Sequence, residues 1–291
     1  PNEIKRLSIT VKLWALCIDE ANNNSINKLG YKSLKAVKFS KFESPKLKKI
    51  RNERSIAEYC WTITPMSPKI IFNINKKIKF VTYIDTDMFF FKNPSFLIDK
   101  FIKSKKKILF TNHDFNDNEK FKEKIYGKFC VQFMTFKKNG SEKIRKIWEK
   151  KCLEWCFAKP SNGRMGDQKY LDDIYKKFKK KIFILDDDFF RSTWNYKKIK
   201  LKKIVAWHFH GFKIINKKLI LMHHLNFLPV EIKNKIYMPY IKSISKSIKK
   251  INFNKTQYYS QKGIIMNIID SLKFKFIQLK IIQKEKYWNL N

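Results

Sequence analysis

Two carboxylates in the segment FVTYIDTDMFFFKNP, residues 80–94, have the type and spacing of a metal site. Residues 80–84 form an apolar, β-branched and aromatic run that predicts a buried strand, and Asp85 and Asp87 follow it directly. Side chains alternate along a strand, so we expect both aspartates on one side and Thr86 on the other. Such a pair suits Mg2+ or Mn2+, which proteins usually share with substrate phosphates.

A second interpretation of the same acids is that they cap the segment that follows. A better cap lies downstream, because Asn93 precedes Pro94, and proline suits the first position of a helix. Paired acids after strands are common in α/β proteins, so the spacing by itself leaves both interpretations open.

The composition predicts a globular protein with anionic partners. At 291 residues the chain has room for one large domain or two modest ones of roughly 100–200 residues each. A hydrophobic share of 44% and seven tryptophans exclude a disordered chain. Codon bias toward lysine accounts for part of the net charge of +39, and the remainder favours a nucleotide diphosphate, an acidic membrane leaflet or nucleic acid.

The five cysteines are odd in number and form no CxxC pair, which favours a reducing cytoplasmic setting. Cys152 and Cys156 stand one helical turn apart, and we expect buried core thiols because no histidine or cysteine partner is near them in sequence. No apolar run approaches the roughly 20 residues of a membrane span. The sequence starts at Pro1 rather than Met, which is compatible with a missing upstream segment.

Strand and helix patterns alternate along the chain, which is typical of an α/β fold. Apolar runs predict strands at residues 11–18, 36–39, 80–84, 108–110, 129–136, 182–185 and 204–209. Helical patterns cover residues 45–59, 94–104 and 140–155, and regular structure should break at Pro65. Another helix should start at residues 167–171, with Asp167 as a candidate N-cap.

Basic helical segments follow Asn216. Residues 264–279 carry apolar side chains at helical spacing with lysines between them, which predicts an amphipathic basic helix. Packing onto its own domain and lying on an anionic membrane surface are both open for this helix. We expect a catalytic α/β domain over residues 1–216 and a helical basic region over residues 217–291.

Four features stand in order: a strand ending Asp-x-Asp, the strand FCVQFMTF, the block GDQKYLD at residues 166–172, and a strand ending HFHGFK at residues 208–213. In this order and spacing they resemble the bacterial glycosyltransferases with a GT-A fold that are related to the family 8, glycogenin-like retaining enzymes. The resemblance covers about residues 51–249, and the segments EYCWTITP at 58–65, Trp194-Asn195 and YMPY at 237–240 add to it. It implies an α/β/α sandwich with a mixed central sheet.

The resemblance also implies roles for individual residues. Asp85 and Asp87 would hold the metal and the diphosphate, with Thr86 beside them at the donor site. In the His-x-x-Gly pattern the metal-binding histidine falls on His208. His210 is the runner-up, because it lies two residues on and should share the strand face.

Four further residues take roles from the same resemblance. Gly211 would let the backbone approach the phosphates, and Lys213 would neutralise them. Asp167 would lie by the donor sugar and the acceptor, as nucleophile, hydrogen-bond acceptor or scaffold, and Gln168 would orient sugar hydroxyls. The N-cap role of Asp167 is compatible with this one.

The chain departs from the family pattern in two places. Cys130-Val131-Gln132 stands where the family has Asn-x-Gly, which leaves the donor-sugar contacts of that strand unassigned. The first strand, residues 11–18, resembles the second strand of these enzymes, so the part that holds the nucleotide base is either upstream or built differently.

We therefore expect a metal-dependent glycosyltransferase, hexosyltransferase-like and retaining. It would move a sugar from a nucleotide-diphosphate donor, with UDP-sugar favoured, to a saccharide or lipid-linked saccharide acceptor. Mn2+ or Mg2+ on Asp85, Asp87 and His208 would offset charge on the departing diphosphate. The expected setting is bacterial surface polysaccharide or lipopolysaccharide synthesis, in the cytoplasm at the inner face of the membrane.

Two other classes of protein stay open. A nucleic-acid-binding protein would use a basic stripe such as KKFKKK at residues 176–181, but it leaves the Asp-x-Asp, DQ and HFHG segments without a role, and no nucleic acid is expected. An inactive GT-A-like assembly protein would explain the Cys130-Val131-Gln132 departure.

Overall fold

The computed structural model describes residues 11–214, 219–223, 228–250 and 287–289. The chain divides into two compact units, Pro1–His208 and Phe209–Asn291.

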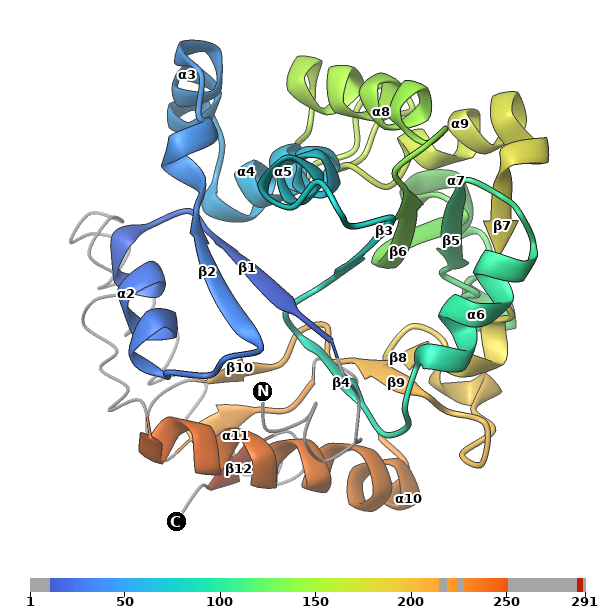
Figure 1. Cartoon of the computed structure of the whole chain (residues 1–291). Coiled ribbons are helices and arrows are strands. Elements are labelled where there is room, and N and C mark those ends of the chain that lie inside the picture. The colour runs from blue at the N-terminus through green and yellow to red at the C-terminus, as the bar shows by residue number, and fades with distance from the viewer. Residues whose placement is uncertain (1–10, 215–218, 224–227, 251–286, 290–291) are drawn as a thin grey trace. The chain divides into compact units, whose positions relative to one another are not determined.

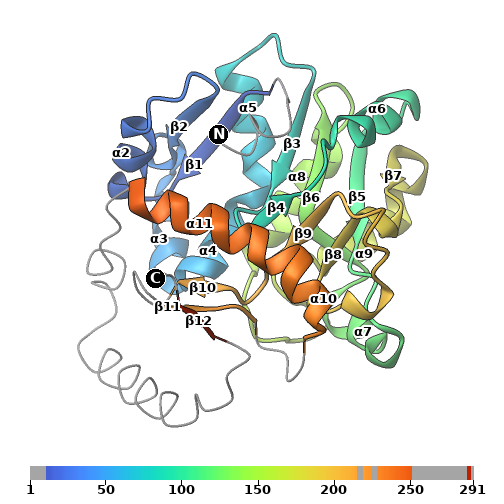
Figure 2. The same cartoon turned by 90° about the horizontal axis from the view of Figure 1, so that it is seen from below.

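The first unit contains a four-stranded sheet in the order β3-β6-β5-β7 (Figures 1 and 2). β3 (Phe80–Ile84) pairs antiparallel with β6 (Phe129–Lys137), which pairs antiparallel with β5 (Ile108–Asn112). β5 in turn pairs parallel with β7 (Ile182–Ile184). Parallel and antiparallel pairs thus share one sheet, which confirms the predicted mixed α/β class.

Helices cover both faces of this sheet. α8 (Glu142–Glu154) and α9 (Tyr170–Phe178) bury apolar side chains with Ile108 and Phe110 of β5. Leu109 belongs instead to the cluster formed with α6 (Ser95–Lys103). Because side chains alternate along a strand, these two clusters lie on opposite faces of the sheet.

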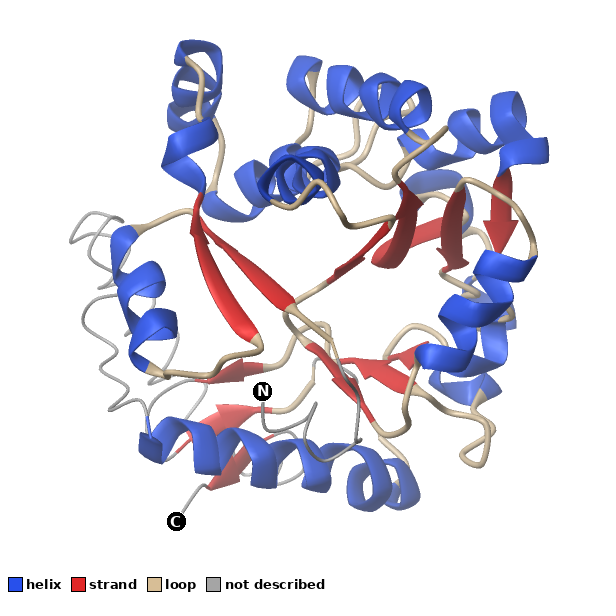
Figure 3. Ribbon diagram, viewed as in Figure 1, coloured by secondary structure: helices blue, strands red, loops and turns tan. Residues whose placement is uncertain are grey.

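A second, three-stranded sheet has the order β4-β9-β8. β4 (Met88–Phe90) pairs antiparallel with β9 (Ala206–His208), and β9 pairs parallel with β8 (Phe190–Ser192). A short loop joins β3 of the first sheet to β4 of the second (Figure 3). This loop carries the sequence Asp85-Thr86-Asp87.

The remaining elements of the first unit lie before β3 or between the strands. They are β1 (Leu13–Cys17), which pairs parallel with β2 (Leu34–Lys38), the helices α2 (Glu20–Lys28), α3 (Pro45–Glu53), α4 (Ile56–Ile63), α5 (Ser67–Ile74) and α7 (Lys122–Tyr126), and the 3-10 turns η1 (Phe39–Phe42), η2 (Thr64–Met66), η3 (Asp117–Glu119), η4 (Lys179–Lys181), η5 (Asp187–Phe189) and η6 (Tyr196–Lys198).

The helical pattern expected over residues 45–59 forms two separate helices in the structure: α3 ends at Glu53, and α4 begins at Ile56. Ser55 caps α4 with a capping box: its side chain accepts from the backbone N–H of Glu58, and the Glu58 carboxylate accepts from the backbone N–H of Ser55. The α-helix breaks at Pro65 as expected: α4 ends at Ile63, the 3-10 turn η2 contains Pro65, and α5 begins at Ser67.

The second unit contains a small antiparallel sheet in the order β10-β11-β12. The ring of Phe209 stacks on Tyr240 of its longest described helix at 3.8 Å between centroids. The amphipathic helix expected over residues 264–279 lies outside the described residues. The elements are β10 (Lys213–Ile214), β11 (Leu219–Leu221), α10 (Val230–Ile232), the π-helix η7 (Lys233–Tyr237), α11 (Met238–Lys250) and β12 (Tyr287–Asn289).

Among the described residues, no helix combines the length and the apolar character needed to cross a bilayer.

Candidate metal centre

The two aspartates of the Asp-x-Asp segment meet in a turn, not along a strand. β3 ends at Ile84, and the backbone N–H of Met88 donates to the carbonyl of Asp85 at 3.3 Å, which closes the turn. The expected strand alternation was therefore the wrong reason for placing both carboxylates on one side. The turn between β3 and β4 brings the two carboxylates to one side instead, because the chain leaves one sheet for another and changes direction here.

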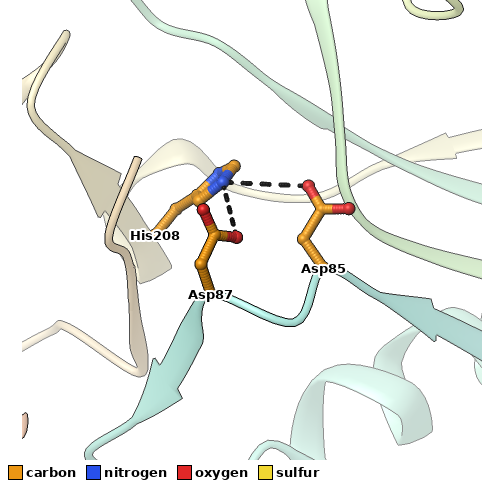
Figure 4. A group of neighbouring side chains, drawn as sticks. All are labelled: Asp85, Asp87 and His208. Carbon is orange, nitrogen blue, oxygen red and sulfur yellow. Dashed lines mark ion pairs between the residues drawn. The ribbon is translucent and has the colours of Figure 1, made fainter. Parts of the chain in front are cut away.

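Strand pairing brings a histidine to these carboxylates. Met88 lies opposite His208 in the β4–β9 pair, so the residue before Met88 is next to the imidazole. The His208 Nε2 atom lies 3.0 Å from Asp87 Oδ1 and 3.8 Å from Asp85 Oδ2 (Figure 4). One ligand atom from each residue lies within 4.8 Å of the others. Two carboxylate oxygens and one imidazole nitrogen are a donor set that suits Mn2+ and accepts Mg2+.

The charge balance of the group favours a cation. The His208 side chain is 8% exposed, while those of Asp85 and Asp87 are 27% and 41% exposed. The two carboxylates therefore form the solvent-facing side of the group, and the imidazole forms its buried side. Burial raises the pKa of Asp85, and His208 and the Tyr83 hydroxyl oppose that rise. Burial lowers the pKa of His208, but its hydrogen bonds to Asp87 and Cys130, together with the charges of Asp87 and Asp85, outweigh this and hold that pKa well above the usual value. Positive charge between the two carboxylates is therefore stabilised.

Three contacts hold His208 in place. The Ser192 hydroxyl donates to the His208 carbonyl at 2.7 Å, and the Trp194 ring meets the imidazole edge-on at 5.1 Å between centroids. The His208 Nδ1 atom lies 3.1 Å from Oε1 of Gln132 on β6. These residues come from β8, from the turn that follows it and from β6, which limits rotation of the imidazole.

A tyrosine holds the first aspartate in a similar way. The Tyr83 hydroxyl donates to Asp85 Oδ1 at 2.7 Å. Sequence reasoning did not identify Tyr83 or Gln132 as part of the site. The available signals were the i, i+2 spacing of Tyr83 and Asp85, and a buried glutamine within the largely apolar run FCVQFMTF.

Asp167 is buried, with 5% of its surface exposed. The Trp148 indole N–H donates to its carbonyl at 2.8 Å. Burial raises the pKa of the Asp167 carboxyl well above its usual value, and the nearby charges of Cys156 and Asp85 raise it further. The N-cap interpretation was wrong, because α9 begins at Tyr170 and its N-cap position is Lys169.

Gln168 is half-buried, and its carbonyl accepts from the backbone N–H of Leu171 at 3.0 Å. Its predicted contact with sugar hydroxyls stays a prediction. The structure brings Asp85, Asp87 and His208 together and places Asp167 close enough to Asp85 for their charges to interact.

The other predicted site residues belong to the second unit. β9 ends at His208, so the expectation that His210 shares its strand face was wrong; His210 is exposed in a turn. Gly211 has a φ of 82°, a backbone conformation that favours glycine. Lys213 is exposed at the start of β10. Their contacts with phosphate stay predictions.

Other sequence candidates have structural roles. His113 is buried, with Nδ1 2.8 Å from the Gly127 carbonyl and its ring stacked on Phe115. Cys152 and Cys156 are buried in the core, as predicted.

Comparison with known proteins places the chain near two curated proteins of Bacillus subtilis (strain 168). It is 28% identical over 223 residues to the uncharacterized protein YfnF, which covers 70% of this chain and 73% of that protein. It is 24% identical over 258 residues to the uncharacterized protein YfnD, and this match covers 82% of this chain and 81% of that protein. No protein-family model matches the chain.

Two solved structures show a distant likeness. The apo form of mouse xyloside xylosyltransferase 1 is 12% identical, covers 69% of this chain and 84% of its own, and gives a TM-score of 0.44. A glycosyltransferase involved in the glycosylation of the major capsid of PBCV-1 is 9% identical, covers 70% of this chain and 94% of its own, and gives a TM-score of 0.41. TM-scores at this level assign neither fold family nor activity, so the function is argued below from the site.

Proposed function

We propose that the protein is a metal-dependent glycosyltransferase of GT-A-like architecture, which moves a sugar from a nucleotide-diphosphate donor to a saccharide or lipid-linked saccharide acceptor. The observation that carries the proposal is the convergence of Asp85, Asp87 and His208, whose ligand atoms lie within 4.8 Å of one another. These are the residues that the motif resemblance selects as metal ligands. Asp85 and His208, the first and last of the three, are 123 positions apart in sequence, so their convergence was not built into the motif.

The donor set fits a hard divalent cation, and Asp85, Asp87 and His208 would hold it. Mn2+ or Mg2+ at this place supplies charge compensation for the diphosphate that leaves the sugar. The exposed side of the group is formed by the carboxylates, and His208 supports them from the buried side. A diphosphate could therefore approach from solvent without displacing the protein ligands.

Asp167 would act on the sugar. Its burial favours the neutral carboxyl form, which can donate a hydrogen bond to a sugar hydroxyl as well as accept one. That property suits orientation of the donor or the acceptor better than attack by a free carboxylate. Gln168, adjacent in the chain and half-buried, supplies a further amide for the same purpose.

The finer part of the proposal rests on the motif resemblance. Retention of configuration, a UDP-sugar donor and a place in surface polysaccharide or lipopolysaccharide synthesis belong to it, as do phosphate contacts by Thr86, Gly211 and Lys213. Work in the cytoplasm at an anionic membrane surface agrees with the net charge of +39.

A donor-cleavage screen tests the proposal. Many glycosyltransferases slowly transfer the sugar to water in place of the acceptor, so the full chain is incubated with a panel of UDP- and GDP-sugars and Mn2+, and the released UDP or GDP is measured. We expect release from at least one donor, stopped by EDTA and by Asp87→Asn. Asp173→Asn is the matched control, because Asp173 is an exposed acid whose carboxylate lies 3.8 Å from Lys176 on α9. Release that survives both EDTA and Asp87→Asn would contradict a metal-dependent transferase.

A further inference from the structure

One residue contacts two members of the metal group. Gln132 on β6 is 2% exposed. Its backbone carbonyl accepts from the N–H of Asp85 at 3.1 Å, which extends the β3–β6 ladder into the turn. Its side-chain Oε1 lies 3.1 Å from Nδ1 of His208. The distance between the aspartate turn and the histidine is therefore fixed partly through a single residue, by its backbone on one side and its side chain on the other.

The atom that faces the imidazole decides which ring nitrogen carries the proton. An amide oxygen has lone pairs and no hydrogen, so its contact with His208 requires a hydrogen on Nδ1. A neutral imidazole protonated at Nδ1 presents a lone pair on Nε2. Nε2 is the atom that lies 3.0 Å from Asp87 Oδ1 and 3.8 Å from Asp85 Oδ2. Without a cation, Nε2 donates a hydrogen to Asp87. A bound cation replaces that hydrogen, and the imidazole can then stay neutral only if Nδ1 keeps its own.

We propose that Gln132 is a positioning residue that fixes the tautomer and the orientation of His208, so that Nε2 is available to a divalent cation held with Asp85 and Asp87. This inference rests on the proposed function, because it assumes that a cation belongs there. It gives a role to the segment Cys130-Val131-Gln132, which differs from the Asn-x-Gly of the resembling enzymes. The glutamine supplies a side-chain hydrogen-bond acceptor, Oε1, and a glycine at that position has no side chain to supply one.

The contacts of His208 with Ser192 and Trp194 do not select a tautomer. The Ser192 hydroxyl bonds to the backbone carbonyl of His208, and the Trp194 ring packs against the imidazole edge-on. Both orient the ring without addressing Nδ1. A side-chain acceptor behind a metal-binding histidine commonly changes metal affinity by about 10- to 100-fold when it is removed.

Cys130 is the neighbour whose effect must be separated from that of Gln132. It lies two residues earlier on β6 and is buried. Burial raises the pKa of its thiol, but His113 and His208 lower it to about 7. A thiol close to His208 is a second group that could influence the imidazole, so it needs its own variant.

Manganese affinity of the full chain tests the inference. Mn2+ is titrated calorimetrically, without nucleotide, into wild type, Gln132→Met, Gln132→Glu and Cys130→Ala. Methionine keeps the shape and removes the acceptor, whereas glutamate keeps the acceptor. We expect Gln132→Met to bind Mn2+ about 10- to 100-fold more weakly, and Gln132→Glu and Cys130→Ala to stay within about threefold of wild type. Wild-type affinity in Gln132→Met, or an equal loss in Gln132→Glu, would overturn the proposal.

A second measurement needs no glutamine variant, in case Gln132→Met does not fold. The wild-type chain is labelled with 15N-histidine and loaded with diamagnetic Zn2+, and the resonances that disappear in His208→Ala are assigned to His208. A proton on Nδ1 and none on Nε2 is the expected result, and the reverse tautomer would refute the inference. If wild type binds neither Mn2+ nor Zn2+, the proposed function fails as well. If wild type binds and Gln132→Met binds equally, only the role of Gln132 fails.

Discussion

Trp148 connects the hydrophobic core to the candidate site, and its replacement by phenylalanine tests that connection. The side chain is 2% exposed and stacks parallel to Phe136 of β6 with 6.4 Å between ring centroids. Its indole N–H donates to the carbonyl of Asp167 at 2.8 Å. Phenylalanine keeps an aromatic ring against Phe136 but removes the donor and part of the volume.

The expected loss has two parts. A buried carbonyl left without its donor costs about 1–3 kcal/mol. A void of about 40 Å³, at about 24 cal/mol per Å³, adds about 1 kcal/mol. Trp148→Phe should therefore lower the free energy of unfolding by about 2–4 kcal/mol, which corresponds to roughly 4–16 °C in the melting temperature of a unit this size.

Urea denaturation followed by circular dichroism measures this loss, with EDTA present so that metal binding does not contribute. Trp155→Phe is the matched control, because Trp155 follows the same helix but is only partly buried, with its ring against Phe157 and Arg164. We expect the control to lose less than about 1 kcal/mol. Equal losses in the two variants would refute the argument that the Asp167 carbonyl depends on Trp148.

Three further variants test separate parts of the structure. Ser55→Ala should lower the free energy of unfolding by about 1 kcal/mol through loss of the α4 capping box, measured by urea denaturation; no change would contradict the cap. Tyr83→Phe should weaken Mn2+ binding about tenfold in calorimetry, since Asp85 Oδ1 loses its donor, and unchanged affinity would contradict that role. Asp167→Asn should raise the melting temperature of the metal-free protein more at pH 8 than at pH 5. Burial raises the folded-state pKa of Asp167 well above 3.8, so the wild-type chain loses stability as the pH rises from about 4 toward that folded-state pKa. The Asp167→Asn variant has no carboxyl to titrate and keeps its stability over this range. Equal gains in melting temperature at both pH values would contradict this.

Much of the α/β framework follows from local sequence pattern. The apolar runs of β5 and β6 were predictable because strands buried on both faces lack polar alternation, and the half-buried edge strand β3 carries a similar apolar run. The three-residue strands β4 and β8 were not, since three residues show no measurable period.

The candidate site was predictable only in its ligands. Asp85, Asp87 and His208 follow from motif resemblance, whereas their approach depends on the pairing of Met88 with His208, which no local pattern encodes. The contact between Gln132 and His208 joins β6 of one sheet to β9 of another. Such a contact is a property of the packed sheets, so the sequence shows the glutamine but not its partner.

The central claim is that Asp85, Asp87 and His208 bind a divalent cation together with a nucleotide diphosphate. Calorimetric titration of UDP and GDP into the full chain, with and without Mn2+, tests it most directly on wild type, Asp87→Ala and the control Asp173→Asn. We expect nucleotide binding that requires Mn2+, is kept in Asp173→Asn and is lost in Asp87→Ala. Binding that needs no metal or survives Asp87→Ala, or no binding of either nucleotide with Mn2+ present, would contradict it.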